Sequence, residues 1–225
     1  MNIIQVSNIT YRVKQKNILT DISFHIQQGD YFALLGENGS GKSTLIDILL
    51  DDLKPSSGNL SFFKKSKKDF RKIGVVYDQL PLFPMLKVDE VINYFCTIYR
   101  LKNKDVKEQY YDIFNLRKIK NSFIRELSQG EKKKVGLVLS ILKPSELLVL
   151  DEPFANLDPT TQIRLKQIIK NLTENKEVTV LVSSHDLTHV TEVCERIVVL
   201  DKGMVVKDIE RSEETLKELE LYFSV

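Results

Sequence analysis

A glycine-rich segment at residues 36–44 constrains the fold of this chain more than any other feature of its sequence. It reads GENGSGKST and satisfies the pattern G-x-x-x-x-G-K-[ST]. A compact apolar run, YFALL at residues 31–35, precedes it, and TLIDILL, which has helical character, follows. Glycines let backbone amides curl around phosphate oxygens, and the start of the next helix adds positive potential. The sequence therefore predicts a strand, a phosphate-binding loop and a helix.

Three side chains at the end of this loop have distinct expected roles. We expect Lys42 to reach the β- and γ-phosphates of a nucleotide, Ser43 to coordinate Mg²⁺, and Thr44 to lie near the α-phosphate. The backbone amides would complete the phosphate site. The expected nucleotide-binding loop consists of Gly36, Glu37, Asn38, Gly39, Ser40, Gly41, Lys42, Ser43 and Thr44.

A pair of acids follows a second apolar run. Residues 147–150 read LLVL and lead directly into Asp151 and Glu152, so a buried strand would deliver both carboxylates to the carboxyl edge of a sheet. Taken alone, two acids of this kind can simply be solvated residues at the end of a strand. Their position downstream of a phosphate loop favours a catalytic role. We expect Asp151 to hold the Mg²⁺ shell and Glu152 to act on the attacking water as general base or positioning group.

Strand and helix patterns alternate along most of the chain and predict an open, mostly parallel sheet. Residues 3–13 and 18–26 instead alternate apolar with polar side chains, which predicts an antiparallel β layer at the N-terminus. Residues from about 81 to 141 are nearly all helical by pattern and interrupt the alternation. The prediction is an α/β fold of the P-loop NTPase class, formed by residues 1–225 as one domain with an inserted helical subdomain. Further strands are predicted at 73–77, 178–182 and 197–200, and helices at 88–101, 129–142, 159–172, 187–195 and 213–221.

Composition excludes several classes of protein. A chain of 225 residues with a net charge of +2 suits a globular enzyme and implies no long-range attraction to nucleic acid. The longest stretch without charged residues is the first eleven, far below the roughly 18 residues of a membrane span.

Two sequence patterns that would point elsewhere are absent. No secretory leader pattern is present, so we expect a cytoplasmic protein. The guanine-specific pattern N-K-x-D is absent, because both Asn-Lys pairs are followed two residues later by Val, and this disfavours GTP.

A short motif before the acid pair supplies the resemblance to a known family. Residues 127–131 read LSQGE and resemble the LSGGQ signature of the ATP-binding cassette (ABC) family. An aromatic residue before the phosphate loop, a glutamine in VVYDQ, the triplet Asn-Leu-Asp and a histidine in SSHD occur around it in the family's order. The chain resembles ABC transporter nucleotide-binding subunits over essentially its whole length. The matching positions are Tyr11, Gln79, the signature, the acid pair, Asn156, Leu157, Asp158 and His185.

The resemblance implies a role for each of these positions, with ATP and Mg²⁺ as ligands. Tyr11 would stack on adenine, although a tyrosine in the core of a strand is the alternative. Gln79 would join the Mg²⁺ and water shell at the hinge to the helical subdomain, and His185 would contact the γ-phosphate. Asp158 would act in the loop between subunits.

In the family, the signature faces the nucleotide of a second subunit. Its amides and helix N-terminus supply positive potential to the γ-phosphate. The resemblance therefore implies a head-to-tail dimer around two ATP molecules, formed with a second copy or with a homologous ATPase subunit. The residues concerned are Ser128, Gln129, Gly130 and Glu131.

Five positions depart from the family pattern. None of them removes a group expected to bind phosphate or metal, so we expect an active ATPase, with turnover slower or more dependent on a partner. The departures are Gln129 for glycine, Glu131 for glutamine, Lys134 for arginine, Asp78 for proline and Asn156 for serine or glycine.

The resemblance also implies a separate transmembrane permease subunit, which would carry the translocation path and hold the chain on the cytoplasmic face of the membrane. The apolar segment at residues 80–86, LPLFPML, is the expected contact. The alternative is a soluble ABC-type ATPase of iron–sulfur assembly, cell division or nucleic-acid maintenance. Six basic residues within 64–72 could favour nucleic acid, but such runs are usually solvated faces, so nucleic acid is not an expected partner.

Overall fold

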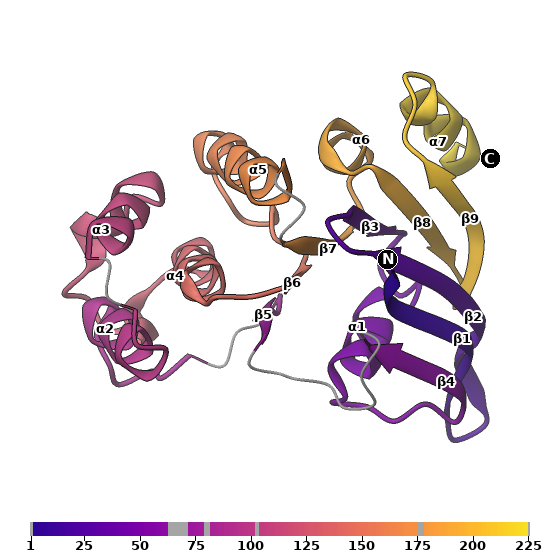
Figure 1. Cartoon of the computed structure of the whole chain (residues 1–225), viewed down its shortest axis with the longest axis horizontal. Helices are drawn as coiled ribbons and strands as arrows, with labels where there is room; N and C mark the ends of the chain where they lie inside the picture. Colours follow the sequence, from indigo (N-terminus) through magenta and orange to yellow (C-terminus); the bar gives the residue numbers. More distant parts are fainter. Residues whose placement is uncertain (1, 63–71, 79–81, 102–103, 175–177, 225) are drawn as a thin grey trace.

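Two β-sheets and a group of helices beside them make up the computed structural model (Figure 1). The structure describes residues 2–62, 72–78, 82–101, 104–174 and 178–224, and only the backbone of residues 104–106. Within these ranges no helix combines the length and the apolar character needed to cross a membrane.

The larger sheet has six strands in the order β5-β6-β7-β3-β8-β9. All of its neighbouring strands run parallel except the last pair, β8 and β9. The central strand β3, which precedes the phosphate loop, is hydrogen-bonded on one side to β7 and on the other to β8. The strands are β3 (Tyr31–Leu35), β5 (Ile73–Val76), β6 (Leu147–Asp151), β7 (Thr179–Ser184), β8 (Arg196–Asp201) and β9 (Met204–Glu210).

The smaller sheet is antiparallel and has the order β2-β1-β4. Its strands are β1 (Asn2–Val13), β2 (Lys16–Gln27) and β4 (Ser57–Phe62). The expected fold class is confirmed, with the addition of β4 to the N-terminal layer. The sequence analysis missed β4 and β9, two edge strands whose side chains are mostly exposed. Only one residue of β4 is buried and none of β9, so neither carries a strong apolar pattern.

Side chains alternate between the two faces of the larger sheet, so β3 contributes to two separate cores. Tyr31, Ala33 and Leu35 pack into the core that lies under α2, α4, α5, α6 and α7. Phe32 and Leu34 pack into the core shared with α1 and the small sheet. The phosphate loop therefore begins at the end of a strand that is buried on both faces.

Helices α2 and α3 lie to one side of the sheets in Figure 1, and α4 lies between them and strands β5 and β6. Because α4 packs against both α2 and β5, the inserted helices join the core of the larger sheet. Most predicted helices are found within two or three residues of their expected ends. The helices are α1 (Lys42–Leu50), α2 (Val88–Ile98), α3 (Lys104–Ile113), α4 (Gln129–Leu142), α5 (Pro159–Glu174), α6 (Leu187–Val193) and α7 (Thr215–Phe223), with 3-10 turns at Leu116–Ile119 and Ile124–Glu126.

Candidate functional site

The phosphate loop connects β3 to α1 and has two requirements for glycine. Gly41 has a φ of 106°, which side chains rarely adopt, and a Cβ there would lie 2.7 Å from a methyl group of Leu19. A Cβ on Gly36 would lie 2.3 Å from the carbonyl oxygen of Leu200. The hydroxyl of Ser40 is buried and has no hydrogen-bond partner among the described residues. The loop thus combines glycine-dependent turns, the start of a helix and an unsatisfied polar atom, as a phosphate cradle requires.

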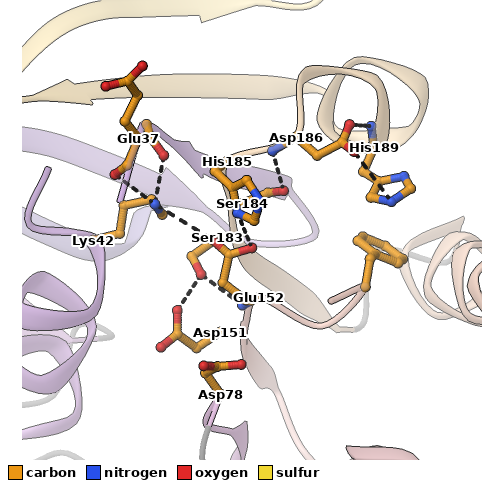
Figure 2. Close-up of polar contacts among 12 residues, drawn as sticks. Glu37, Lys42, Asp78, Asp151, Glu152, Ser183, Ser184, His185, Asp186 and His189 are labelled. Carbon is orange, nitrogen blue, oxygen red and sulfur yellow. Dashed lines mark hydrogen bonds and ion pairs between the residues drawn. The ribbon is translucent and has the colours of Figure 1, made fainter. Parts of the chain in front are cut away.

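Lys42 is folded back across this loop and is almost completely buried. Its ammonium donates hydrogen bonds to the carbonyl oxygens of Gly36, at 2.7 Å, and Glu37, at 3.2 Å (Figure 2). The same ammonium lies 3.5 Å from Oε1 of Glu152. The structure therefore brings together the lysine that we expect to bind phosphate and one member of the acid pair.

The acid pair lies at the carboxyl end of β6 and is held by the next strand. Asp151 is buried, and its carboxylate accepts a hydrogen bond from the hydroxyl of Ser183 on β7. The backbone amide of Glu152 donates to the same hydroxyl at 2.9 Å. Ser183 was not predicted as a site residue; its position two residues before His185, as the first serine of SSHD, is the one sequence signal for it.

Glu152 leaves the strand with a φ of 47°, which turns the chain sharply and directs the carboxylate toward Lys42. Its Oε2 atom lies 3.0 Å from Nδ1 of His185, while its Oε1 atom is buried and accepts no hydrogen bond from the described residues. Because Oε1 lies beside the Lys42 ammonium, it would act as a general base once a phosphate competes for that ammonium. His185 is half exposed and stands at the rim of the same site.

The residues present fit a magnesium ion. Mg²⁺ prefers a few protein oxygens and keeps several waters, and Ser43 and Asp151 supply a hydroxyl and a carboxylate. Burial raises the pKa of Asp47 on α1, and the negative charges of Asp52 and Asp151 raise it further. Among the described residues no three His, Cys, Asp or Glu side chains form a metal-binding group. Gln79, the third expected ligand, lies outside the described residues.

The signature forms the first turn of α4, with Ser128 as its N-cap. The amide of Glu131 donates to the hydroxyl of Ser128 at 3.3 Å, and the carboxylate of Glu131 accepts from the amide and the hydroxyl of Ser128, both at 2.8 Å. This reciprocal capping box fixes the turn. In the described part of the chain, no hydrogen bond or ion pair joins the signature to the phosphate loop.

The signature packs instead against the loop that follows the acid pair. A Cβ on Gly130 would lie 2.4 Å from the carbonyl oxygen of Asn156, so only glycine permits this contact. Asp158 accepts hydrogen bonds from Lys134, at 2.6 Å, and from the amide and hydroxyl of Thr161. These bonds make Asp158 the cap of α5, and the donors, Lys134 first, hold its pKa well below the usual range.

The remaining expected residues are Tyr11 and the basic run at residues 64–72. Tyr11 lies half-buried in β1, opposite Leu19 of β2, and packs against the core of the small sheet, so adenine stacking stays a prediction. Of the basic run, Lys72 forms an ion pair with Glu146. Lys64, Lys65, Lys67, Lys68 and Arg71 lie outside the described residues.

Comparisons with known proteins identify the family of this chain. The family model described as "ABC transporter" matches residues 19–155. An ABC transporter ATP-binding protein of Methanocaldococcus jannaschii is 32% identical over 206 residues, covering 90% of this chain and 76% of the relative.

Solved structures of ATP-binding cassettes have the same fold. An ATP-binding subunit of an ABC transporter is 25% identical, with a TM-score of 0.82, covering 99% of this chain and 93% of the other. A dimeric cassette bound to ADP and Pi in a post-hydrolysis state is 24% identical, with a TM-score of 0.81, covering 93% and 99%. The chain therefore belongs to the ABC transporter family, as an ATP-binding subunit with ATPase chemistry.

Proposed function

We propose that this chain hydrolyses ATP between two subunits and couples the reaction to a separate membrane permease. The observation that carries the proposal is the placement of Glu152 between Lys42 and His185 (Figure 2). One carboxylate contacts the two side chains expected to bind the γ-phosphate, so it lies where a water molecule would attack.

The chemistry follows from the groups at this edge of the sheet. The amides of residues 36–44 and the ammonium of Lys42 would bind and orient the phosphates, which leaves little covalent chemistry to the protein. Glu152 would accept the proton of the attacking water at Oε1, and His185 would donate a hydrogen bond to the phosphate oxygen. Mg²⁺, held by Ser43, Asp151 and Gln79, would neutralise charge on the phosphates when bound.

The second part of the proposal is a head-to-tail dimer. Ser128 and Gln129 at the first turn of α4 are exposed, and half-exposed Asp158 is bound to Lys134 of the same helix. Helix N-termini bind anions, so this turn supports binding the γ-phosphate on a second copy or a homologous subunit. A cassette with the same fold has been solved as a dimer bound to ADP and Pi, which supports a dimer for this chain.

The third part is a membrane permease as partner, with the chain on the cytoplasmic face of the membrane. Phe83 and Met85, which precede α2, are 57% and 65% exposed, and Tyr94 and Ile98 on α2 are 56% and 54% exposed. Tyr94 and Ile98 are four residues apart and share one face of the helix. Exposed apolar side chains in one subdomain support a protein contact there.

Affinity purification from detergent-solubilised membranes of the source, followed by mass spectrometry, tests the permease. We expect a stoichiometric polytopic membrane protein with the parent chain and much less with Ile98→Ser. The matched control is Ile163→Ser on α5, because Ile163 is equally apolar and 67% exposed but outside the helical subdomain. Recovery of soluble proteins or nucleic acid alone would overturn the coupling to a permease.

A further inference from the structure

A buried lysine on the signature helix contacts two other segments of the site. Lys133 lies on α4 and its side chain is 3% exposed. Its ammonium is 2.9 Å from Oδ1 of Asp78 and 3.4 Å from the carbonyl oxygen of Asp151. Figure 2 shows Asp78 beside Asp151 at the end of the sheet. One cation therefore joins α4, the segment that follows β5, and the end of β6.

Lys133 needs a negatively charged partner because burying an unpaired ammonium costs a large amount of free energy. When one partner of a buried ion pair is removed, the remaining charge is left uncompensated and the structure is strongly destabilised. The carboxylate of Asp78 is 50% exposed, whereas Lys133 is enclosed. The position of the lysine, and of the helix that carries it, thus depends on where Asp78 lies.

The three segments that Lys133 joins lie at two places that matter for the proposed dimer, the sheet edge and the signature turn. Asp151 lies at the sheet edge that binds the nucleotide of its own chain, and Asp78 directly precedes Gln79 in the sequence. Lys133 follows the capping turn of Ser128 and Glu131 by little more than half a turn of helix. The ion pair therefore spans the sheet edge and the signature within one chain.

We propose that Lys133, through its ion pair with Asp78, is a positioning residue that sets the placement of the signature turn relative to the sheet edge. This inference rests on the proposed ATP-dependent dimer, which closes only if both surfaces of each chain meet their counterparts together. Binding of ATP to one chain uses the phosphate loop and does not need the pair. Closure of two chains does need it, and a displacement of Asp78 carries α4 with it.

The test uses ATP-dependent dimerisation in the hydrolysis-deficient Glu152→Gln chain, measured by analytical ultracentrifugation. Lys133→Met and Asp78→Asn should each weaken the ATP-dependent dimer about tenfold or more, the scale on which two coupled sites affect each other. Binding of a fluorescent ATP analogue to the single chain should change less than about twofold, and Lys133→Arg should restore dimerisation. The double variant should lose less than the product of the two single losses, because both remove one contact.

Two exposed residues provide matched controls. Lys170→Met on α5 and Asp51→Asn at the end of α1 change the same residue types away from the pair, and asparagine tolerates the left-handed φ of 70° at position 51. With Glu152 intact, the pair variants should lower the specific ATPase activity at low protein concentration and regain it as the concentration rises, because the defect is in dimerisation. A loss of folded protein alone would lower the specific activity by the same factor at every concentration.

Dimerisation equal to that of the controls, even with a lowered melting temperature, would overturn the positioning role. If Asp78→Asn fails to fold because the buried ammonium loses its charged partner, Lys133→Met decides, since it removes that ammonium and leaves only the half-exposed carboxylate of Asp78 without a partner. A parent chain that binds ATP and never dimerises, alone or with a homologous subunit, would overturn the proposed dimer and this inference together. The two failures are therefore distinguishable by the parent chain.

Discussion

The Oε1 atom of Glu152 lies 3.5 Å from the Nζ atom of Lys42, so the expected general base and the expected phosphate-binding cation already contact each other. The γ-phosphate of ATP would compete with this carboxylate for the same ammonium. Removing the negative charge of Glu152 should therefore have opposite effects on binding and on chemistry.

Glu152→Gln should bind ATP at least as tightly as the parent chain and hydrolyse it about 10²–10⁴-fold more slowly, the usual contribution of a general base. Phosphate release and binding of a fluorescent ATP analogue measure the two effects. Glu174→Gln, at the exposed end of α5, is the control and should leave both unchanged. Turnover within a few-fold of the parent would show that Glu152 is not the base.

Glu131→Gln tests the most conspicuous departure in the signature. The amide oxygen of glutamine can keep the capping bonds to Ser128, but the negative charge beside the proposed phosphate site disappears. We expect stronger ATP-dependent dimerisation and a loss of about 0.3–1 kcal/mol of stability, because an acid in the first turn favours the helix dipole. Weaker dimerisation would contradict the electrostatic argument.

Gly130→Ala should destabilise the chain, because the new Cβ would approach the carbonyl oxygen of Asn156 to 2.4 Å. Overpacking of this kind costs about 1–3 kcal/mol, which urea denaturation can measure. Gln129→Ala is the control at the neighbouring, exposed position, and alanine there favours the helix. Equal stability of the two variants would show that the contact with Asn156 relaxes freely.

Asp158→Ala should remove the cap of α5 and cost about 1 kcal/mol at neutral pH. Because the folded pKa of Asp158 is lowered by Lys134 and Thr161, its stabilisation is complete above the usual carboxyl pKa near 4 and is lost as the pH falls toward the folded pKa. The difference in unfolding free energy between parent and variant should therefore shrink from pH 7 to about pH 3. Glu174→Ala should show no such trend, and a constant difference for Asp158→Ala would refute the linkage.

The sequence predicted the parts of this molecule that depend on local patterns. The phosphate loop, the buried strands beside it and the acid pair follow from glycine spacing and apolar runs, and the structure confirms their order and fold. The edge strands β4 and β9 were missed because their side chains are largely exposed, so no apolar pattern marks them.

Contacts between distant segments could not be predicted in the same way. Ser183 and Lys133 are ordinary residues in sequence, and their roles depend on which hydroxyl or carboxylate the fold brings next to them. The run of three lysines after the signature gave no indication that one is buried and its neighbour is bound to Asp158. Such partners are set by tertiary packing, which a single sequence does not display.

The position of β3 also bears on how the protein is made. Both hydrogen-bonded neighbours of this early strand, β7 and β8, come from the last quarter of the chain, and the amide of Gly203 donates to the carbonyl oxygen of Ser40 in the phosphate loop. Pairings between such distant segments form slowly. During synthesis on the ribosome, β3 therefore lacks both of its strand neighbours until β7 and β8 have been translated, so the loop that follows β3 reaches its final surroundings late.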